Sequence, residues 1–284
     1  MEFILVAIAK NEAPFIKEWV AYHRWVCGFD TVLIYENDSS DESKDVLSEL
    51  SKIGLCNWIE WPRSEHNPPQ TTAYADALNR FRNVDGWMCF LDIDEFLVLK
   101  KHKSIKDFLS KIPKNVGSVS FNWKIFYSKD EFCSKDFVTK RMEFVLEDNG
   151  HVKTIARIKA IKVPCVHTCR LAPGFRYLNS CGFDYSINLN ELSDIKMSLD
   201  ASMCVRRSHI NYENAQINHY QIKSKNYCIN KDNRGCACAG SFMNPNSTIA
   251  YENCLKIVDQ KSNYDIKNII SKIKPNFYEE LNST

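Results

Sequence analysis

The sequence of 284 residues predicts an α/β fold in which a mixed, mainly parallel sheet is flanked by helices. Short apolar runs rich in β-branched residues recur, and each is followed by a stretch with helical spacing of its apolar residues. Strands that alternate with helices favour parallel pairing, because the crossover helix lets consecutive strands run the same way. With 44% hydrophobic residues the chain can bury one large core or two modest ones.

Individual elements follow from these patterns. We expect strands at residues 3–9, 31–35, 56–61 and 87–99. We expect helices at residues 11–28, 39–53 and 74–81. Asn11 is predicted to cap the first helix, which ends at Gly28, and Ser39 with Glu42 has the spacing of a capping box for the second.

Three carboxylates interrupt the apolar run at residues 87–99. Asp92, Asp94 and Glu95 have apolar residues on both sides, so they lie within a core element. A buried element keeps carboxylates only when something offsets their desolvation, and a divalent cation is a common partner. The alternative is a solvated turn between two short strands. We predict a cation site here, with Asp94 as a direct ligand.

Polar residues follow three of the predicted strands. They are Lys10 and Asn11, residues 36–41, and residues 92–95. Ligands of parallel sheets bind beyond the carboxyl ends of the strands, so these clusters are expected to share one binding rim. The alternative is that they form only helix caps and turns.

Composition argues against several functional classes. A formal net charge of +2 gives no electrostatic footprint for nucleic acid. The apolar run 3–9 lacks the basic region of a signal peptide, and no stretch supplies about 18 uninterrupted apolar residues. The 12 cysteines are dispersed through segments of ordinary core composition, which favours reduced thiols. We therefore expect a soluble protein of the cytoplasm.

Spaced motifs along residues 1–240 carry a resemblance to a known family. They are Asn11-Glu12-x-Pro14-x-Ile16-x-Glu18-Trp19, Glu36 to Asp41, Gln70-x-x-x-Tyr74, Phe90 to Leu97, and Ile217-Asn218-His219-Tyr220 with Lys223 and Lys225. This set resembles glycosyltransferase family 92 and its relatives in the broad family 2 group. The resemblance implies a GT-A (Rossmann-like) fold, a nucleotide-sugar donor, a glycan or glycolipid acceptor, and Mn²⁺ or Mg²⁺ as cofactor.

The same resemblance implies roles for individual residues. It makes Asp92, Asp94 and His219 candidates for the metal. It makes Ala9, Lys10, Asn11, Glu36, Asn37, Asp92, Lys223 and Lys225 candidates for the donor. Two aspartates are usual where this chain has Glu36-Asn37, which leaves the base open, with uridine expected. His167 also matches a family histidine and competes for the metal or acceptor site. The alternative for both histidines is a structural role.

Families 2 and 92 invert the anomeric carbon, which requires a carboxylate that takes the proton of the acceptor hydroxyl. Asp130 and Glu131 are the candidates, in a loop where the family has a glycine-rich turn that this chain lacks. Glu213 and Asp184 remain alternatives. Two other functions also stay open, namely a catalytically silent nucleotide-sugar-binding protein and a metal-dependent phosphohydrolase.

Residues 241–284 are expected to form a helical C-terminal extension beside a domain at 1–240. Apolar residues at 255–258 and 266–273 indicate helices that pack on the domain or on a partner. Four lysines make this tail basic, which a solvated helical face explains. Peripheral membrane contact is the alternative.

Overall fold

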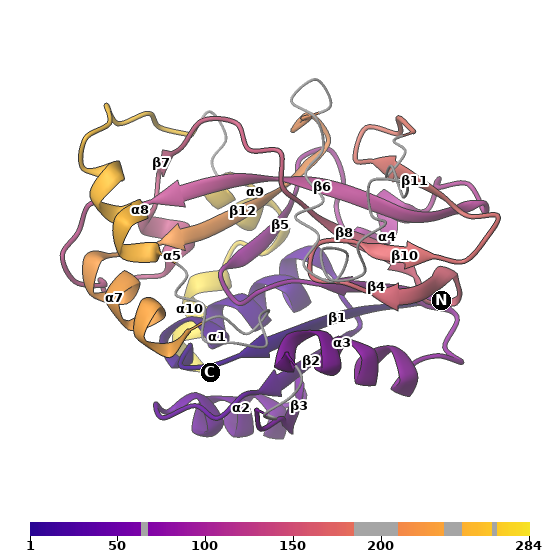
Figure 1. Cartoon of the computed structure of the whole chain (residues 1–284), viewed down its shortest axis with the longest axis horizontal. Coiled ribbons are helices and arrows are strands. Elements are labelled where there is room, and N and C mark those ends of the chain that lie inside the picture. The colour runs from indigo at the N-terminus through magenta and orange to yellow at the C-terminus, as the bar shows by residue number, and fades with distance from the viewer. Residues whose placement is uncertain (64–67, 185–209, 236–245, 263–265) are drawn as a thin grey trace.

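The structure is a computed structural model that describes residues 1–63, 68–184, 210–235, 246–262 and 266–284. Its central feature is a sheet with the strand order β3-β2-β1-β4-β8-β6-β12-β5, and β7 and β11 also pair with β6 (Figure 1). These strands are β1 (Glu2–Ala9), β2 (Thr31–Glu36), β3 (Asn57–Glu60), β4 (Gly86–Phe90), β5 (Glu95–Leu99), β6 (Val116–Tyr127), β7 (Phe144–Val145), β8 (Val152–Arg157), β11 (Arg176–Asn179) and β12 (Ala215–Ile222). A separate antiparallel pair consists of β9 (Ile161–Pro164) and β10 (Cys169–Leu171).

Helices cover the sheet and extend its ends. They are α1 (Ala13–Ala21), the π-helix η1 (Tyr22–Cys27), α2 (Ser43–Lys52), α3 (Pro69–Arg80), α4 (Ile105–Leu109), α5 (Val138–Arg141), the 3₁₀ helix η2 (Ile158–Ala160), α7 (Lys225–Arg234), α8 (Ser247–Cys254), α9 (Ile266–Ile273) and α10 (Phe277–Ser283).

The sheet has a parallel half and a mixed half. β1 is parallel to both β2 and β4, and β2 is parallel to β3. β8 is antiparallel to β4 and β6, whereas β12 is parallel to β6 and antiparallel to β5. The predicted α/β fold with a mainly parallel sheet and flanking helices is therefore confirmed.

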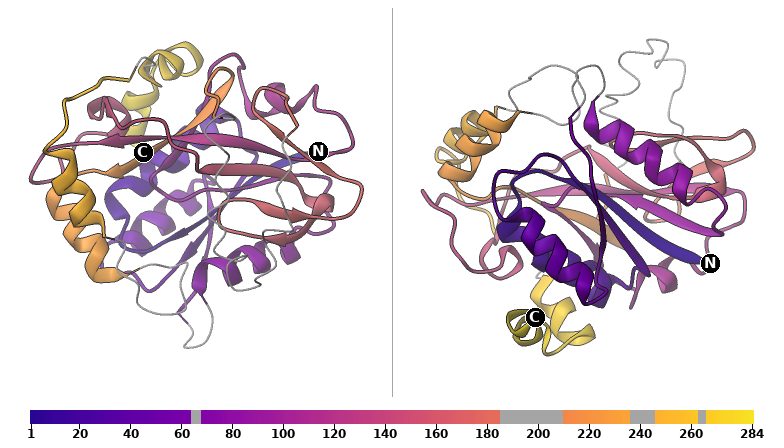
Figure 2. Two further views of the ribbon diagram at one scale, coloured as in Figure 1. Left: turned by 45° about the horizontal axis from the view of Figure 1, so that its top comes forward. Right: turned by 90° about the horizontal axis from the view of Figure 1, so that it is seen from below.

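The side chains of β1 alternate between two helical layers. Leu5 and Ala7 belong to the core that also contains apolar residues of α1 and α2. Ile4 and Val6 belong to a second core with apolar residues of α3. Figure 2 shows helices on both sides of the sheet. Burial of both faces explains why this strand is apolar at nearly every position.

The predicted helix caps are wrong, although the helices exist. Asn11 has a φ of 53° and α1 starts at Ala13, while the Asn11 Oδ1 accepts a hydrogen bond from Ser40 N at 2.7 Å. Ser39 Oγ accepts from Asn11 N at 2.9 Å and does not cap α2, which starts at Ser43. Both side chains bind the facing loop, so a tertiary contact replaces the local cap. Gly28 does end η1, with a φ of 79°.

The run at residues 87–99 is two strands instead of one. β4 ends at Phe90 and β5 starts at Glu95, so Asp92 and Asp94 occupy a tight turn between them. The two strands do not pair with each other, because β4 pairs with β1 and β8 while β5 pairs with β12. The acids therefore lie at the carboxyl end of a parallel strand.

The C-terminal helices pack onto the α1 side of the sheet. Ile269 and Ile270 of α9 and Phe277 of α10 are buried in the same core as α1. Phe277 packs edge-on against Tyr22, with ring centroids 6.5 Å apart. The apolar stripe of α9 thus faces the protein, and the proposed membrane contact gains no support. No helix within the described ranges is long and apolar enough to cross a bilayer.

The predicted packing of residues 255–258 and the predicted domain boundary are not confirmed. Leu255 and Val258 follow the end of α8 and are 49% and 93% exposed, so the expectation that they pack in a helix is wrong. The predicted domain boundary between residues 240 and 241 lies outside the described residues and stays a prediction.

Replacing Phe277 by alanine tests the docking of the tail. Phe277 is fully buried, so Phe277→Ala should lower the free energy of unfolding by about 3–5 kcal/mol. The control is Ile249→Ala on α8, where the side chain is 56% exposed and the loss should be at most about 0.5 kcal/mol. Urea denaturation measures both values. Equal losses in the two variants would contradict this packing.

Candidate functional site

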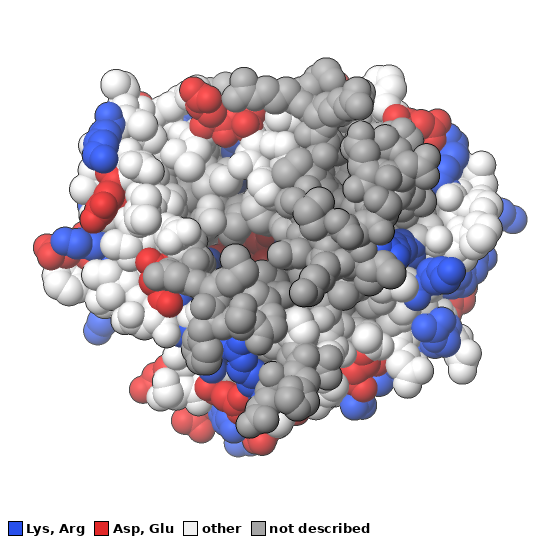
Figure 3. All heavy atoms as spheres, in the orientation of Figure 1, with Lys and Arg blue, Asp and Glu red and all other residues white. Residues whose placement is uncertain are grey.

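A pocket of about 180 Å³ lies at the carboxyl ends of the parallel strands. Its lining comes from the ends of β1 and β2, the start of α3, the β4–β5 turn, β12 and α7. The lining residues are Ile8, Ala9, Lys10, Glu12, Asn37, Arg63, Gln70, Asp92, Ile93, Asp94, His219, Lys231, Arg234 and Gly235. Acidic atoms are visible in a central recess of the surface in Figure 3.

The β4–β5 turn is held by its own backbone and by neighbouring elements. Glu95 N donates to Asp92 O at 3.0 Å, and Asp92 N donates back to Glu95 Oε2 at 2.8 Å. Tyr220 N of β12 donates to Asp94 O at 2.8 Å. Trp19 Nε1 of α1 donates to Glu95 O at 2.8 Å. These bonds fix the backbone that carries the two aspartates.

Asp94 is a buried carboxylate that two lysines and a histidine surround. Its Oδ2 lies 2.9 Å from Lys231 Nζ and 3.8 Å from Lys223 Nζ, and its Oδ1 lies 3.4 Å from His219 Nε2. Burial by itself would raise the pKa of Asp94, but Lys231, His219 and Lys223 outweigh it and hold that pKa well below its usual value. Asp94 is therefore ionised at neutral pH.

His219 faces Asp94 as a neutral imidazole. It lies on β12, and its ring packs edge-on against Trp123 at a centroid distance of 4.3 Å. Burial lowers its pKa even though Asp94 opposes the shift. Its Nδ1 is buried with no hydrogen-bond partner among the described residues. The ring thus presents Nε2 toward a carboxylate oxygen inside the pocket.

Asp92 is held on both of its carboxylate oxygens. Gln70 Nε2 donates to Oδ1 at 2.8 Å, and Lys153 Nζ donates to Oδ2 at 3.1 Å. Lys153 also lies 3.3 Å from Glu95 Oε2. Burial raises the pKa of Glu95. Burial alone would lower the pKa of Lys153, but the negative charges of Asp92 and Glu95 outweigh this effect and raise that pKa.

Sequence reasoning missed Lys153 as a site residue. Lys153 is the only lysine in β8 (Val152–Arg157). The alternation of side chains along a strand does not show whether such a lysine faces solvent or the site. Gln70, which belongs to the motif Gln70-x-x-x-Tyr74, lines the pocket.

Helix α7 brings two cations to the pocket. Ser224 caps this helix by accepting from Tyr227 N at 3.1 Å. Lys231 contacts Asp94, and Arg234 pairs with Glu12 at 2.6 Å. Tyr227 OH also donates to Glu12, at 3.0 Å. Glu12 therefore fixes the end of α7 against the start of α1.

The predicted donor residues at the first two strands divide into two groups. Ala9, Lys10 and Asn37 line the pocket. Glu36 does not line the pocket. Its side chain is buried, and its Oε1 accepts a hydrogen bond of 2.6 Å from Ser39 N. Asn11 lines an adjacent hollow of about 710 Å³ that shares Lys10, Lys231 and Arg234 with the pocket.

The predicted cations Lys223 and Lys225 do not line the pocket. Lys223 is 0% exposed, with its Nζ 3.9 Å from the ring centroid of Tyr227 and 4.5 Å from that of Phe15. Burial lowers the pKa of Lys223 to about 8, against the opposing effects of Glu12 and Asp94. Lys225 is exposed at the start of α7.

The candidate catalytic carboxylates lie outside the pocket lining. Asp130 O and Glu131 O accept from the backbone N–H groups of Lys225 and Asn226, both at 3.0 Å. The Asp130 side chain is 60% exposed, 3.8 Å from Arg141. Their role stays a prediction.

The alternative bases are surface acids paired with cations. Glu213 contacts Lys101 and is 67% exposed, while Asp184 pairs with Arg176 at 2.5 Å and is 63% exposed.

His167 lies beside the site and not in its lining. Its Nδ1 is 3.1 Å from Val152 O, and its ring packs against Trp123 and His151. Burial, followed by the nearby Lys153, lowers its pKa to about 3.

A preformed metal cluster is not seen in the part of the chain that the structure describes, where no group of three or more His, Cys, Asp or Glu side chains could hold a metal. The predicted ligands Asp92, Asp94 and His219 nevertheless all line the same pocket. Their assignment as ligands stays a prediction.

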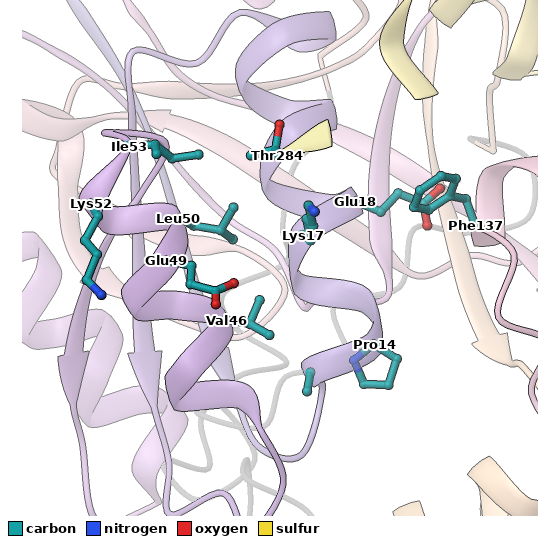
Figure 4. A pocket seen from close by; sticks show the side chains of 11 residues that line it. Pro14, Lys17, Glu18, Val46, Glu49, Leu50, Lys52, Ile53, Phe137 and Thr284 are labelled. Carbon is teal, nitrogen blue, oxygen red and sulfur yellow. The ribbon is translucent and has the colours of Figure 1, made fainter. Parts of the chain in front are cut away.

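A second hollow of about 460 Å³ lies between α1 and α2 (Figure 4). Its lining shares no residue with the pocket at the strand ends. Glu18 reaches its edge, but this carboxylate accepts from Val138 N and Thr139 N at 2.9 and 3.1 Å. These hydrogen bonds anchor the start of α5 to α1.

Lys223 makes stability depend on pH. Its folded pKa of about 8 lies below the ordinary 10.5, so the unfolded chain holds the proton more tightly. The free energy of unfolding should therefore rise with pH between about 8 and 10.5, by roughly 3 kcal/mol relative to Lys223→Met. Urea denaturation at pH 7.5 and pH 10.5 measures this change. Lys225→Met is the control and should follow the wild type, and a constant difference between Lys223→Met and wild type would contradict the assignment.

Comparison with known proteins adds independent findings. The chain is 26% identical over 188 residues to a glycosyltransferase family 92 protein of Ricinus communis, covering 60% of this chain and 31% of that protein. It is 28% identical over 113 residues to a galactan β-1,4-galactosyltransferase of Arabidopsis thaliana, covering 37% and 21%. The chain thus spans less than a third of the length of these relatives.

Solved structures show a weaker likeness. Glucosyl-3-phosphoglycerate synthase from Mycobacterium tuberculosis, in complex with Mn²⁺, uridine diphosphate and glucosyl-3-phosphoglycerate, aligns over 75% of this chain and 81% of its own. The TM-score is 0.37 and the identity 13%, which is too low to bear on function. The sequence model of glycosyltransferase family 92, however, matches residues 7–274, and the chain therefore belongs to this family.

Proposed function

We propose that this protein transfers a sugar from a nucleotide-diphosphate donor to a hydroxyl group of a glycan or glycolipid. One observation carries the proposal: Asp92, Asp94 and His219 meet Lys231 and Arg234 in a single pocket at the strand ends. Carboxylates and an imidazole suit a divalent cation, and the two cationic side chains suit phosphate oxygens. Membership of family 92 supports the same reaction.

Lys231 and Arg234 receive the negative charge of the leaving nucleotide. Breaking the bond to the sugar leaves charge on the diphosphate, and nearby cations stabilise that charge in a site with little water. Lys231 now contacts Asp94, and Arg234 contacts Glu12. Both side chains line the pocket, so a diphosphate that enters it meets them directly.

The residues present fit a divalent metal. Asp94 Oδ1 and His219 Nε2 face each other at 3.4 Å, and His219 is neutral as metal binding requires. Asp92 adds a second carboxylate from the same turn. These three residues would hold Mn²⁺ or Mg²⁺, which supplies charge neutralisation to the diphosphate when bound. Asp92 also suits the ribose of the donor.

Ala9, Lys10 and Asn37 form the side of the pocket that suits the base and ribose. The backbone here is fixed, because Asn37 N donates to Ala9 O at 2.8 Å and Asn37 Nδ2 donates to Trp61 O at 2.8 Å. Uridine is the proposed base.

The proposed reaction inverts the anomeric carbon, with Asp130 or Glu131 as the group that accepts the proton of the acceptor hydroxyl. Both residues bind the start of α7 through their carbonyl oxygens, which links their loop to the helix that carries Lys231. The acceptor would approach from that side.

Donor binding should depend on the metal and on Asp94. In thermal unfolding, UDP-sugars with Mn²⁺ should raise the melting temperature of the wild type, and chelation by EDTA should remove the shift. Asp94→Asn and His219→Ala should each lower kcat/KM at least about 100-fold. Asp136→Asn, an exposed acid outside the pocket, should match the wild type. Full activity of Asp94→Asn would contradict the proposal, and nucleotide release at equal rates with and without acceptor would identify a phosphohydrolase.

The catalytic base, Asp130 or Glu131, is tested separately from donor binding. Asp130→Asn and Glu131→Gln are made singly. The variant that lacks the catalytic base should have a kcat about 10²–10⁴-fold lower than the wild type, with unchanged affinity for the donor. Single-turnover transfer and calorimetric titration measure the two quantities. Unimpaired turnover in both variants would remove these residues as candidates.

A further inference from the structure

A fully buried ammonium group lies behind the acidic turn, and the proposed reaction does not use it. Lys153 is on β8, opposite Phe121 of β6, and its side chain is 0% exposed. Its Nζ lies 3.1 Å from Asp92 Oδ2 and 3.3 Å from Glu95 Oε2. Burial of a charge is costly, so a lysine at this position must make contacts that offset its desolvation.

The contacts of Asp92 show what Lys153 does. Gln70 Nε2 donates to Oδ1 at 2.8 Å, so the carboxylate is gripped from two sides, by an amide on one oxygen and an ammonium on the other. Rotation of the carboxylate would break at least one of these bonds. An ionised carboxylate has about four acceptor positions, and the two bonds leave the others for the pocket.

Asp92 differs from its neighbours in exposure. Its side chain is 33% exposed and lines the pocket, whereas Asp94 and Glu95 are 6% and 0% exposed. A carboxylate on a turn that is one-third exposed would ordinarily sample several rotamers. The ammonium of Lys153 removes that freedom from behind, without occupying space in the pocket.

We infer that Lys153 is a positioning residue, which holds the Asp92 carboxylate in the orientation that receives the nucleotide-sugar donor. The inference rests on the proposed function and deepens it. Residues that hold a binding carboxylate from behind commonly change affinity or activity about 10–100-fold when replaced. Lys153 itself touches neither donor nor reacting atoms, so its effect is on the geometry of Asp92.

The test separates orientation from charge balance. Lys153→Met alone leaves Asp92 and the buried Glu95 without the ammonium that faces them and should lower the melting temperature by roughly 5–10 °C. Lys153→Met/Glu95→Gln removes the ammonium together with the Glu95 carboxyl group that faces it and should melt within a few degrees of the wild type. Glu95→Gln alone shows what the second change contributes, because Glu95 Oε2 also accepts from Asp92 N. The matched control is Lys162→Met, an exposed lysine on the neighbouring β9.

Calorimetric titration with UDP and Mn²⁺ gives the decisive quantity. The double variant should bind UDP about 10–100-fold more weakly than the wild type, although its fold is intact. Adding Asp92→Asn to the double variant should cause no further loss beyond that of Asp92→Asn alone, because both changes act through one carboxylate. Lys162→Met should bind like the wild type.

Each contrary result has a distinct meaning. Wild-type affinity in the double variant, or losses that add to those of Asp92→Asn, would overturn the positioning role alone. A double variant that melts more than about 10 °C below the wild type would show that Lys153 serves the fold, which also overturns it. A wild type that binds no nucleotide with Mn²⁺ would overturn the proposed function together with this inference.

Discussion

The burial of two carboxylates, Asp94 in the β4–β5 turn and Glu95 at the start of β5, is the constraint on which the rest of the site depends. The side chains of Asp94 and Glu95 are 6% and 0% exposed, so each requires compensating charge or hydrogen bonds. The compensation comes from distant elements, with Lys153 on β8, His219 on β12 and Lys231 on α7. Removal of one partner from a buried ion pair costs about 3–5 kcal/mol, so the turn and these elements stabilise one another.

Sheet register brings these partners to the turn. β12 pairs with β5, and His219 stands opposite Glu95, the first residue after the turn. β8 pairs with β4, the strand that leads into the turn. α7 begins shortly after β12, so Lys231 returns to the carboxylate that β12 already contacts. The pairing of β8 and β12 with the strands on either side of the turn therefore brings Lys153 and His219 to the acids.

The paired charges of Lys231, Arg234, Asp94 and Glu12 suit the pocket to a ligand that contains both a cation and an anion. Lys231 and Arg234 are satisfied by Asp94 and Glu12 when the pocket contains no anion. A divalent cation added alone would meet Lys231 and Lys223 as like charges near Asp94. A cation and a diphosphate that enter together preserve the local balance of charge, which is the combination that sugar transfer from a nucleotide-diphosphate donor requires.

Local sequence determined the strand–helix units and the polar residues that follow three of the strands, among them Asn37, Asp92 and Asp94, because apolar periodicity and the residues that end each run are read locally. His219, within β12, was expected only from the resemblance to family 92. Only the tertiary structure decided the partners of those residues. Lys153 and Lys231 contact acids that are 61 and 137 positions away in the chain. The Lys223 ammonium lies against the rings of Tyr227 and Phe15, and Ser39 binds a facing loop instead of capping a helix. Pairing across such distances depends on sheet register and helix packing, which no local pattern of residues encodes.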